Sequence, residues 1–185
     1  IPKVIKVIDS RRTGKEKAVK IPTVCPECGG RIAKDTEEDV ASRCVNPLCP
    51  AQLVRGVLHF GSREAMDIEG LGRAVVEQVV AKRFVRSVAD LYQLNTTQLL
   101  ALELFKEKKA VNLLRAIDAS KSRGLARLLY GLGIRHVGEK AAITLAQRFG
   151  SMSRLLEATE DQLQEIPEIG PVMAQSLVEA LQQPA

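Results

Sequence analysis

The chain of 185 residues carries a formal net charge of +5, has no tryptophan and is only 3% aromatic. A chain of this length can build one or two domains with a hydrophobic core. No run of about 18 apolar residues is present, which argues against a membrane-spanning helix, and the first residues do not form a signal peptide. We therefore expect no membrane partner, and we interpret Ile1-Pro2-Lys3 as the edge of a piece cut from a longer protein. The scarcity of aromatic side chains argues against binding by stacking on exposed bases.

The charge is unevenly distributed along the chain. Residues 1–24 hold seven basic and two acidic side chains, so the other 161 residues are neutral overall. Within these, residues 57–130 hold twelve basic and eight acidic side chains, whereas residues 152–185 hold one basic and six acidic side chains. Affinity for a polyanion must therefore come from the local placement of charges and not from the total.

Residues 1–22 have a pattern typical of β structure, because short runs of Val and Ile flank a charged turn through residues 10–17. The segment is too short to bury a core by itself. We interpret it as the last strands of a sheet whose other strands are missing, and a disordered basic tail is the alternative.

The cysteines form two pairs, with the spacing C-x2-C, fifteen residues, C-x4-C. Tetrahedral Zn²⁺ takes four thiolates from two tight turns, so residues 23–56 are predicted to be a four-cysteine zinc finger with a structural metal. Glycines after the second cysteine should leave N–H groups free to turn toward sulfur, and His59 is expected to pack or be solvated. A disulfide or a thioredoxin-like motif is the alternative, but no βαβ pattern is present and the cysteine usage suggests a reducing compartment. The predicted zinc ligands are Cys25, Cys28, Cys44 and Cys49.

One pattern recurs four times in residues 57–185. Each copy has a helical pattern, a turn of the form apolar-x-x-apolar-Gly and a second helical pattern, and the aligned last positions of the turns are 34, 32 and 32 residues apart. These are helix-hairpin-helix units, predicted at about 57–94, 95–122, 123–151 and 152–185. The turns run from Ile68 to Gly72, Glu103 to Lys106, Ile134 to Gly138 and Ile166 to Gly170. The predicted fold class is mainly α, with four tandem units preceded by a small four-cysteine zinc finger and a short β remnant.

The hairpin turns predict anion binding. A glycine before the second helix allows positive φ and the close approach of another backbone. The first N–H groups of that helix have no partner within it and lie at the positive end of the helix dipole. Four such turns on one body suit a nucleic-acid backbone. The alternative is an all-α bundle whose turns merely need glycine.

The four turns are not equivalent. The second lacks the glycine, which puts its backbone geometry in doubt, but it has three lysines, which a solvated face would explain equally well. The third combines the turn with two basic side chains and is the strongest candidate. In the fourth, Pro171 removes one donor and acidic surroundings favour packing, so we expect the first three turns to face phosphate more strongly. The predicted DNA-contacting residues are Gly70, Leu71, Gly72, Arg73, Lys106, Lys108, Lys109, Arg135, His136, Val137, Gly138, Lys140, Ile169 and Gly170, and no catalytic residue is predicted.

Three stretches carry a family signature: Cys-Pro-Ala-Gln at residues 49–52, HFGSREAMDIEGLG at residues 59–72 and ARLLYGLGIRHVG at residues 126–138. With the zinc spacing, they resemble the C-terminal half of bacterial NAD-dependent DNA ligases. The resemblance covers the whole chain and implies that residues 1–22 are the C-terminal strands of an OB-fold, followed by the zinc finger and a hairpin domain over residues 57–185. The family usually has a glycine where this chain has Lys106.

The resemblance implies a part in sealing nicked duplex DNA. In that family an N-terminal domain uses NAD to adenylate a lysine, AMP passes to the 5′ phosphate, and the 3′ hydroxyl displaces it with Mg²⁺ present, while the hairpin domain grips the minor groove. The chain has no Lys-x-Asp-Gly motif, so we expect it to be inactive by itself, with NAD and Mg²⁺ belonging to domains it lacks. The implied partners are nicked double-stranded DNA and the adenylation, OB-fold and BRCT domains of the ligase, in the bacterial cytoplasm at the nucleoid.

Two other functions are open alternatives. A base-excision glycosylase also uses a hairpin, but the catalytic aspartate in its Gly-Val-Asp context is absent here. A protein-interaction or DNA-binding module of another repair complex is the second, with the hairpins acting as packing units.

Overall fold

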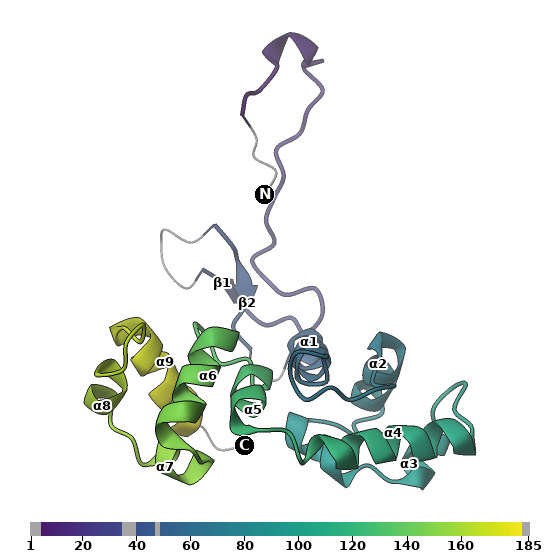
Figure 1. Cartoon of the computed structure of the whole chain (residues 1–185). Coiled ribbons are helices and arrows are strands. Elements are labelled where there is room, and N and C mark those ends of the chain that lie inside the picture. The colour runs from purple at the N-terminus through teal and green to yellow at the C-terminus, as the bar shows by residue number, and fades with distance from the viewer. Residues whose placement is uncertain (1–4, 35–39, 47–48, 183–185) are drawn as a thin grey trace. The chain divides into compact units, whose positions relative to one another are not determined.

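The computed structural model describes residues 5–34, 40–46 and 49–182 (Figure 1). The chain divides into two compact units, residues 1–46 and 47–185. In the first unit, β1 (Ile32–Ala33) pairs antiparallel with β2 (Arg43–Cys44), with Ile32 opposite Cys44. None of the described helices has the length and apolar character that crossing a membrane requires.

Residues 5–22 do not form the expected strands. Their regular structure, within the described residues, is one 3-10 turn, η1 (Asp9–Arg11), and their apolar side chains are exposed, Ile5 at 93% and Val19 at 92%. An extended segment becomes a strand when a neighbouring strand satisfies its N–H and C=O groups, and no described strand pairs with this one. Residues 5–22 thus form no strand here, and the expectation that they are strands of a sheet whose other strands are missing stays a prediction. Residues 1–4 lie outside the described ranges, and the assignment to an OB-fold stays a prediction.

The second unit is helical, and the helices on either side of each predicted turn pack on one another: α1 on α2, α3 on α4, α5 on α6, and α8 on α9. The predicted fold class, mainly α with hairpins after a cysteine module, is confirmed. The elements are α1 (Pro50–Phe60), α2 (Arg73–Ala81), η2 (Val88–Gln93), α3 (Thr96–Leu100), α4 (Glu107–Ser120), α5 (Leu125–Gly131), α6 (Glu139–Phe149), α7 (Met152–Leu156), α8 (Glu160–Gln164) and α9 (Pro171–Gln182).

All four hairpin turns have one geometry. In each, the C=O of a buried apolar residue accepts a hydrogen bond from the N–H of a second buried apolar residue three positions on, with N···O distances of 3.0 to 3.4 Å. The residue just before the second apolar one has positive φ, which a type II turn requires at its third position. The apolar pairs are Ile68 and Leu71, Leu102 and Phe105, Ile134 and Val137, and Ile166 and Ile169. The residues with positive φ are Gly70 (88°), Leu104 (58°), His136 (65°) and Glu168 (74°).

This geometry corrects three expectations about the turns. The positive φ lies two residues before the aligned glycine, which is itself extended, with φ of −80° at Gly72 and −82° at Gly138. Lys106 takes the equivalent place with φ −119° and ψ 166°, a region open to any residue. The missing glycine therefore does not distort the second turn, which also begins one residue earlier than expected, at Leu102.

The four hairpins are built as two pairs, each around its own hydrophobic core. The buried apolar pairs of the first two turns belong to one core, which extends from Val57 to Ile117. The buried apolar pairs of the third and fourth turns belong to a second core, from Leu129 to Leu177. The nearly uniform spacing of the repeats contains no sign of this pairing, so the sequence alone did not predict it.

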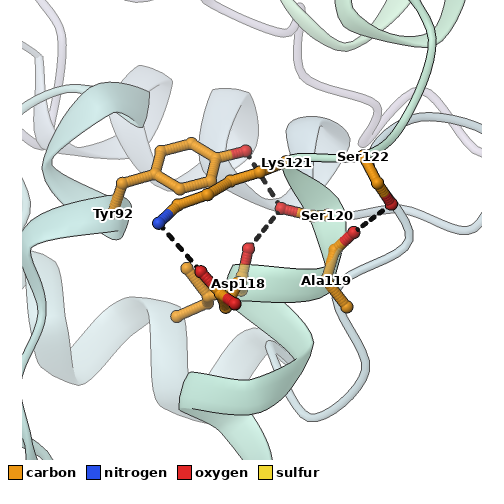
Figure 2. A network of polar contacts seen from close by, with 7 residues as sticks. Tyr92, Asp118, Ala119, Ser120, Lys121 and Ser122 are labelled. Carbon is orange, nitrogen blue, oxygen red and sulfur yellow. Dashed lines mark hydrogen bonds and ion pairs between the residues drawn. The ribbon is translucent and has the colours of Figure 1, made fainter.

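A polar network holds η2 against the end of α4 in the first pair (Figure 2). Ser120, only 1% exposed, donates its hydroxyl hydrogen to the Ile117 carbonyl at 2.7 Å and lies 3.0 Å from the Tyr92 hydroxyl. Because Ser120 has one hydrogen to donate, Tyr92 is the donor in the second bond. The buried hydroxyl is thus fully satisfied, and it ties the connection between the first two hairpins to the core.

The joint between the two pairs is formed by α1 and the turn after it on one side and by α5 on the other. The His59 Nε2–H donates to the Tyr130 carbonyl at 2.7 Å, and the two rings meet edge to face at 4.8 Å. The Arg127 guanidinium donates to the Ala65 carbonyl at 2.6 Å. Gly131 is buried where a Cβ would lie 3.2 Å from the Ala65 Cβ and 3.3 Å from the Phe60 ring. His59 is therefore a packed residue, as expected, and a side chain at Gly131 would force the neighbours of this joint to shift by a few tenths of an ångström.

Gly131→Val should destabilise the protein by about 1 to 3 kcal/mol, because the added methyl groups overfill the joint. The matched control is Gly56→Val, also at a helical glycine but with open space around it; valine there should be neutral or slightly stabilising. Urea unfolding followed by circular dichroism measures both. Equal midpoints for the two variants would contradict a tight joint.

Candidate metal centre and nucleic-acid interface

The four cysteines are positioned to bind a metal. Their Sγ atoms all lie within 4.8 Å of one another, and those of Cys28 and Cys44 are 3.5 Å apart. Zinc–sulfur bonds of about 2.3 Å in a tetrahedron place sulfurs roughly 3.8 Å apart, whereas a disulfide needs about 2.05 Å. None of these four described cysteines forms a disulfide, so that alternative is not supported, and the donor set fits Zn²⁺.

Local backbone geometry explains how the cysteines are held. The Cys25 N–H donates to the Gly30 carbonyl at 2.7 Å, which closes the first knuckle, and the Gly30 N–H points at the Cys28 Sγ at 3.4 Å. A Cβ on Gly30 would lie 2.9 Å from the Asn46 Cβ, so this position has no room for one. The expectation that an N–H after the second cysteine turns toward sulfur is confirmed. Such N–H···S bonds stabilise a thiolate that carries negative charge.

The second helix of each of the first three hairpins begins without a side-chain cap. The N-cap residues of α2, α4 and α6, which are Gly72, Lys106 and Gly138, provide no side-chain acceptor for the N–H groups of the first turn. The short helices α3, α7 and α8 differ, because the side chains of their N-caps, Asn95, Ser151 and Thr159, accept an N–H at the third position. The chain thus caps these three five-residue helices and leaves the second helices of the first three hairpins without a side-chain cap, as it also leaves α1 and α5.

Three of the predicted contact residues hold the turns together from inside. Leu71, Val137 and Ile169 are 4 to 6% exposed, and their N–H groups are bonded within the turn. The side chains and the N–H groups of these three residues are therefore used inside the chain, where they support the turn, and their contact with DNA stays a prediction. The remaining predicted residues lie on the exposed surface: Gly70, Gly72, Arg73, Lys106, Lys108, Lys109, Arg135, His136, Gly138, Lys140 and Gly170.

Two of the predicted cations have acidic neighbours. The Arg73 guanidinium lies 3.3 Å from the Glu77 carboxylate one turn along α2. Lys140, in the first turn of α6, forms an ion pair with Glu168 at the tip of the fourth hairpin. Both pairs are exposed and therefore weak. A phosphate at the third hairpin would compete with Glu168 for the lysine.

The first pair of hairpins contains a basic groove, with a volume of about 800 Å³. One wall is formed by Glu69 and Gly70 of the first hairpin, and the other by the second hairpin and α4. Its basic side chains are Lys106, Lys108, Lys109 and Arg115. Sequence reasoning missed Arg115, although its spacing of seven residues from Lys108 places the two on one face of a helix.

Comparison with known proteins connects both sites to one family. Residues 24–51 match the family described as "NAD-dependent DNA ligase C4 zinc finger domain", and residues 127–185 match the helix-hairpin-helix motif. Proteins named DNA ligase from Anoxybacillus flavithermus, Bacillus cytotoxicus and Bacillus cereus are 54%, 53% and 52% identical to the chain over 178 residues. The chain carries the zinc-finger and hairpin region of the NAD-dependent DNA ligase family. These relatives are matched over 96% of this chain but only 26% of their own length.

We predict that the ligase zinc finger binds one Zn²⁺ and loses it in Cys44→Ser. Metal binding to such a module contributes on the order of 10 kcal/mol to its folding, so residues 23–56 should unfold without zinc. Native mass spectrometry counts the metal, and hydrogen exchange of residues 24–46 reports the unfolding. Glu27→Gln, a change inside the first knuckle at a residue that is not a ligand, is the control and should retain zinc. Unchanged protection in metal-free protein would contradict a structural metal.

Proposed function

We propose that this chain is the DNA-binding region of an NAD-dependent DNA ligase and that it grips nicked duplex DNA, through phosphate and minor-groove contacts, while the nick is sealed. The adenylation, OB-fold and BRCT domains of the parent ligase are its proposed partners, and NAD and Mg²⁺ would serve those domains. The proposed setting is the bacterial cytoplasm, at the nucleoid.

The observation that carries the proposal is the set of uncapped helix starts at equivalent positions. The first residues of these helices lie on the exposed surface, and an exposed helix start attracts an anion through its unpaired N–H donors and the helix dipole. At Gly72, Gly138 and Gly170 a Cβ would meet no described atom within 4 Å, so packing inside the chain does not require glycine there. A bare backbone at these positions instead suits an outside group that comes close, such as a phosphate.

The distribution of charge supports unequal shares for the hairpins. The basic groove lies in the first pair, and the third hairpin has Arg135 and Lys140 on its exposed rim. The fourth has Glu168 at its tip and Pro171 as the first residue of α9, which removes one donor. We infer that the first three hairpins supply most of the phosphate contacts, and that the fourth mainly completes the core of its pair.

Binding to nicked duplex DNA should weaken steeply with salt. If about four phosphates are neutralised, log K should fall with log salt concentration at a slope near −3.6, because bound counterions are released. Fluorescence anisotropy of a nicked duplex between about 50 and 200 mM salt would measure the slope. A slope near zero would remove the phosphate-binding proposal, and would favour a protein-interaction module.

Gly138→Asp should weaken DNA binding at least tenfold. The new carboxylate would accept hydrogen bonds from the uncapped N–H groups at the start of α6, and it would repel phosphate. The fold should tolerate it, since Gly138 is extended and has open space around it. Gly124→Asp is the matched control, because Gly124 is also an exposed, extended and uncapped N-cap but follows no hairpin turn. The control should bind within about twofold of the unmodified chain. Equal losses in both variants would indicate a general charge effect and count against the hairpin site.

A further inference from the structure

Leu104, at the tip of the second hairpin, has a side chain that packing does not explain. It is 93% exposed, and its φ of 58° lies in the left-handed region, which is unfavourable for a leucine. The equivalent residue of the first hairpin is Gly70, and glycine adopts positive φ without steric strain. Strained residues that the surrounding structure holds in place cluster at functional sites. The position therefore suggests a task outside the core.

The surroundings of Leu104 are basic. It lines the groove of the first pair together with Lys106, Lys108, Lys109 and Arg115, and Glu69 on the opposite wall is the acidic side chain among the lining residues. The Lys109 Nζ lies 4.3 Å from the centre of the Phe105 ring, which keeps this ammonium beside the turn. One apolar tip is thus flanked by several positive charges.

The side chain of Leu104 also changes what the second turn can offer. Gly70 leaves the backbone of the first turn bare, whereas Leu104 places a branched side chain at the same point. A phosphate cannot approach the second turn as closely as the first. Any contact made by the second hairpin must therefore come mainly from side chains.

We propose that Leu104 lies against the sugar wall of the minor groove of duplex DNA, with Lys106 and Lys108 on the flanking phosphates. The minor groove is about 6 Å wide, and phosphates border it on both sides. An apolar side chain between cations complements this arrangement of apolar sugar carbons between anions. The inference rests on the proposed function and assigns to the second hairpin a contact different in kind from that of the first and third.

The test is the sign of the change in DNA affinity for Leu104→Gly. If Leu104 contacts the groove, the variant binds nicked duplex about tenfold more weakly, and the salt slope is unchanged because no phosphate contact is lost. Leu104→Met retains an apolar side chain and binds within about twofold of the unmodified chain. If Leu104 only shields the turn, glycine exposes the N–H groups, binding becomes tighter and the slope steepens, which would overturn the proposal.

Two controls separate the possible failures. Leu156→Gly removes another exposed leucine, 54% accessible and outside the groove, and should leave affinity unchanged; an equal loss there would also overturn the proposal. Thermal unfolding of Leu104→Gly should show no loss of stability, since glycine relieves the unfavourable φ. If the unmodified chain binds nicked duplex with no dependence on salt, the proposed function fails as a whole, independently of Leu104.

Discussion

Every α-helix starts with N–H groups that no residue of the helix can satisfy. This structure depends on which helix starts have these N–H groups capped by side chains and which have them uncapped. The chain caps the short helices α3, α7 and α8 with its own side chains and leaves the starts of α2, α4 and α6 without such caps. Each uncapped start is held outward because two apolar residues of the preceding turn are buried in a core. The hydrophobic effect therefore fixes the direction of the polar groups, and burial on one side of each turn determines what the other side presents to solvent.

The arrangement in two pairs extends this constraint from a single turn to two turns at a time. Two hairpins share one core, so their exposed turns are fixed relative to each other by packing and not by a linker. The joint around Gly131 and His59 then connects the two cores through close contacts between α1 and α5. Pairing explains why a repeat too small to bury its own apolar face can still hold a turn in a defined position.

Features set by local chemistry could be predicted from the sequence. The spacing of the cysteines indicated a metal site, and the spacing of the turns indicated the hairpins. Features that depend on contacts between segments distant in the sequence could not be predicted. Residues 5–22 have strand composition but no described neighbour to pair with, and nothing in the even repeat distances distinguishes two pairs from four separate units. Positive φ was predicted at the aligned glycine, whose φ is in fact ordinary. The position that does have positive φ holds four different residue types, Gly70, Leu104, His136 and Glu168, so the sequence pattern did not reveal it.

The uncapped helix starts also affect how this region would respond to engineering for heat resistance. A Ser, Asn or Asp at an N-cap typically stabilises a helix by about 1 kcal/mol relative to alanine, and by a few tenths relative to glycine. Selection for melting temperature alone would therefore favour acceptor side chains at Gly72 and Gly138, and each gain would occupy the donors on which the proposed grip depends. A thermostable variant of this region would have to gain its stability elsewhere, for example in the two cores.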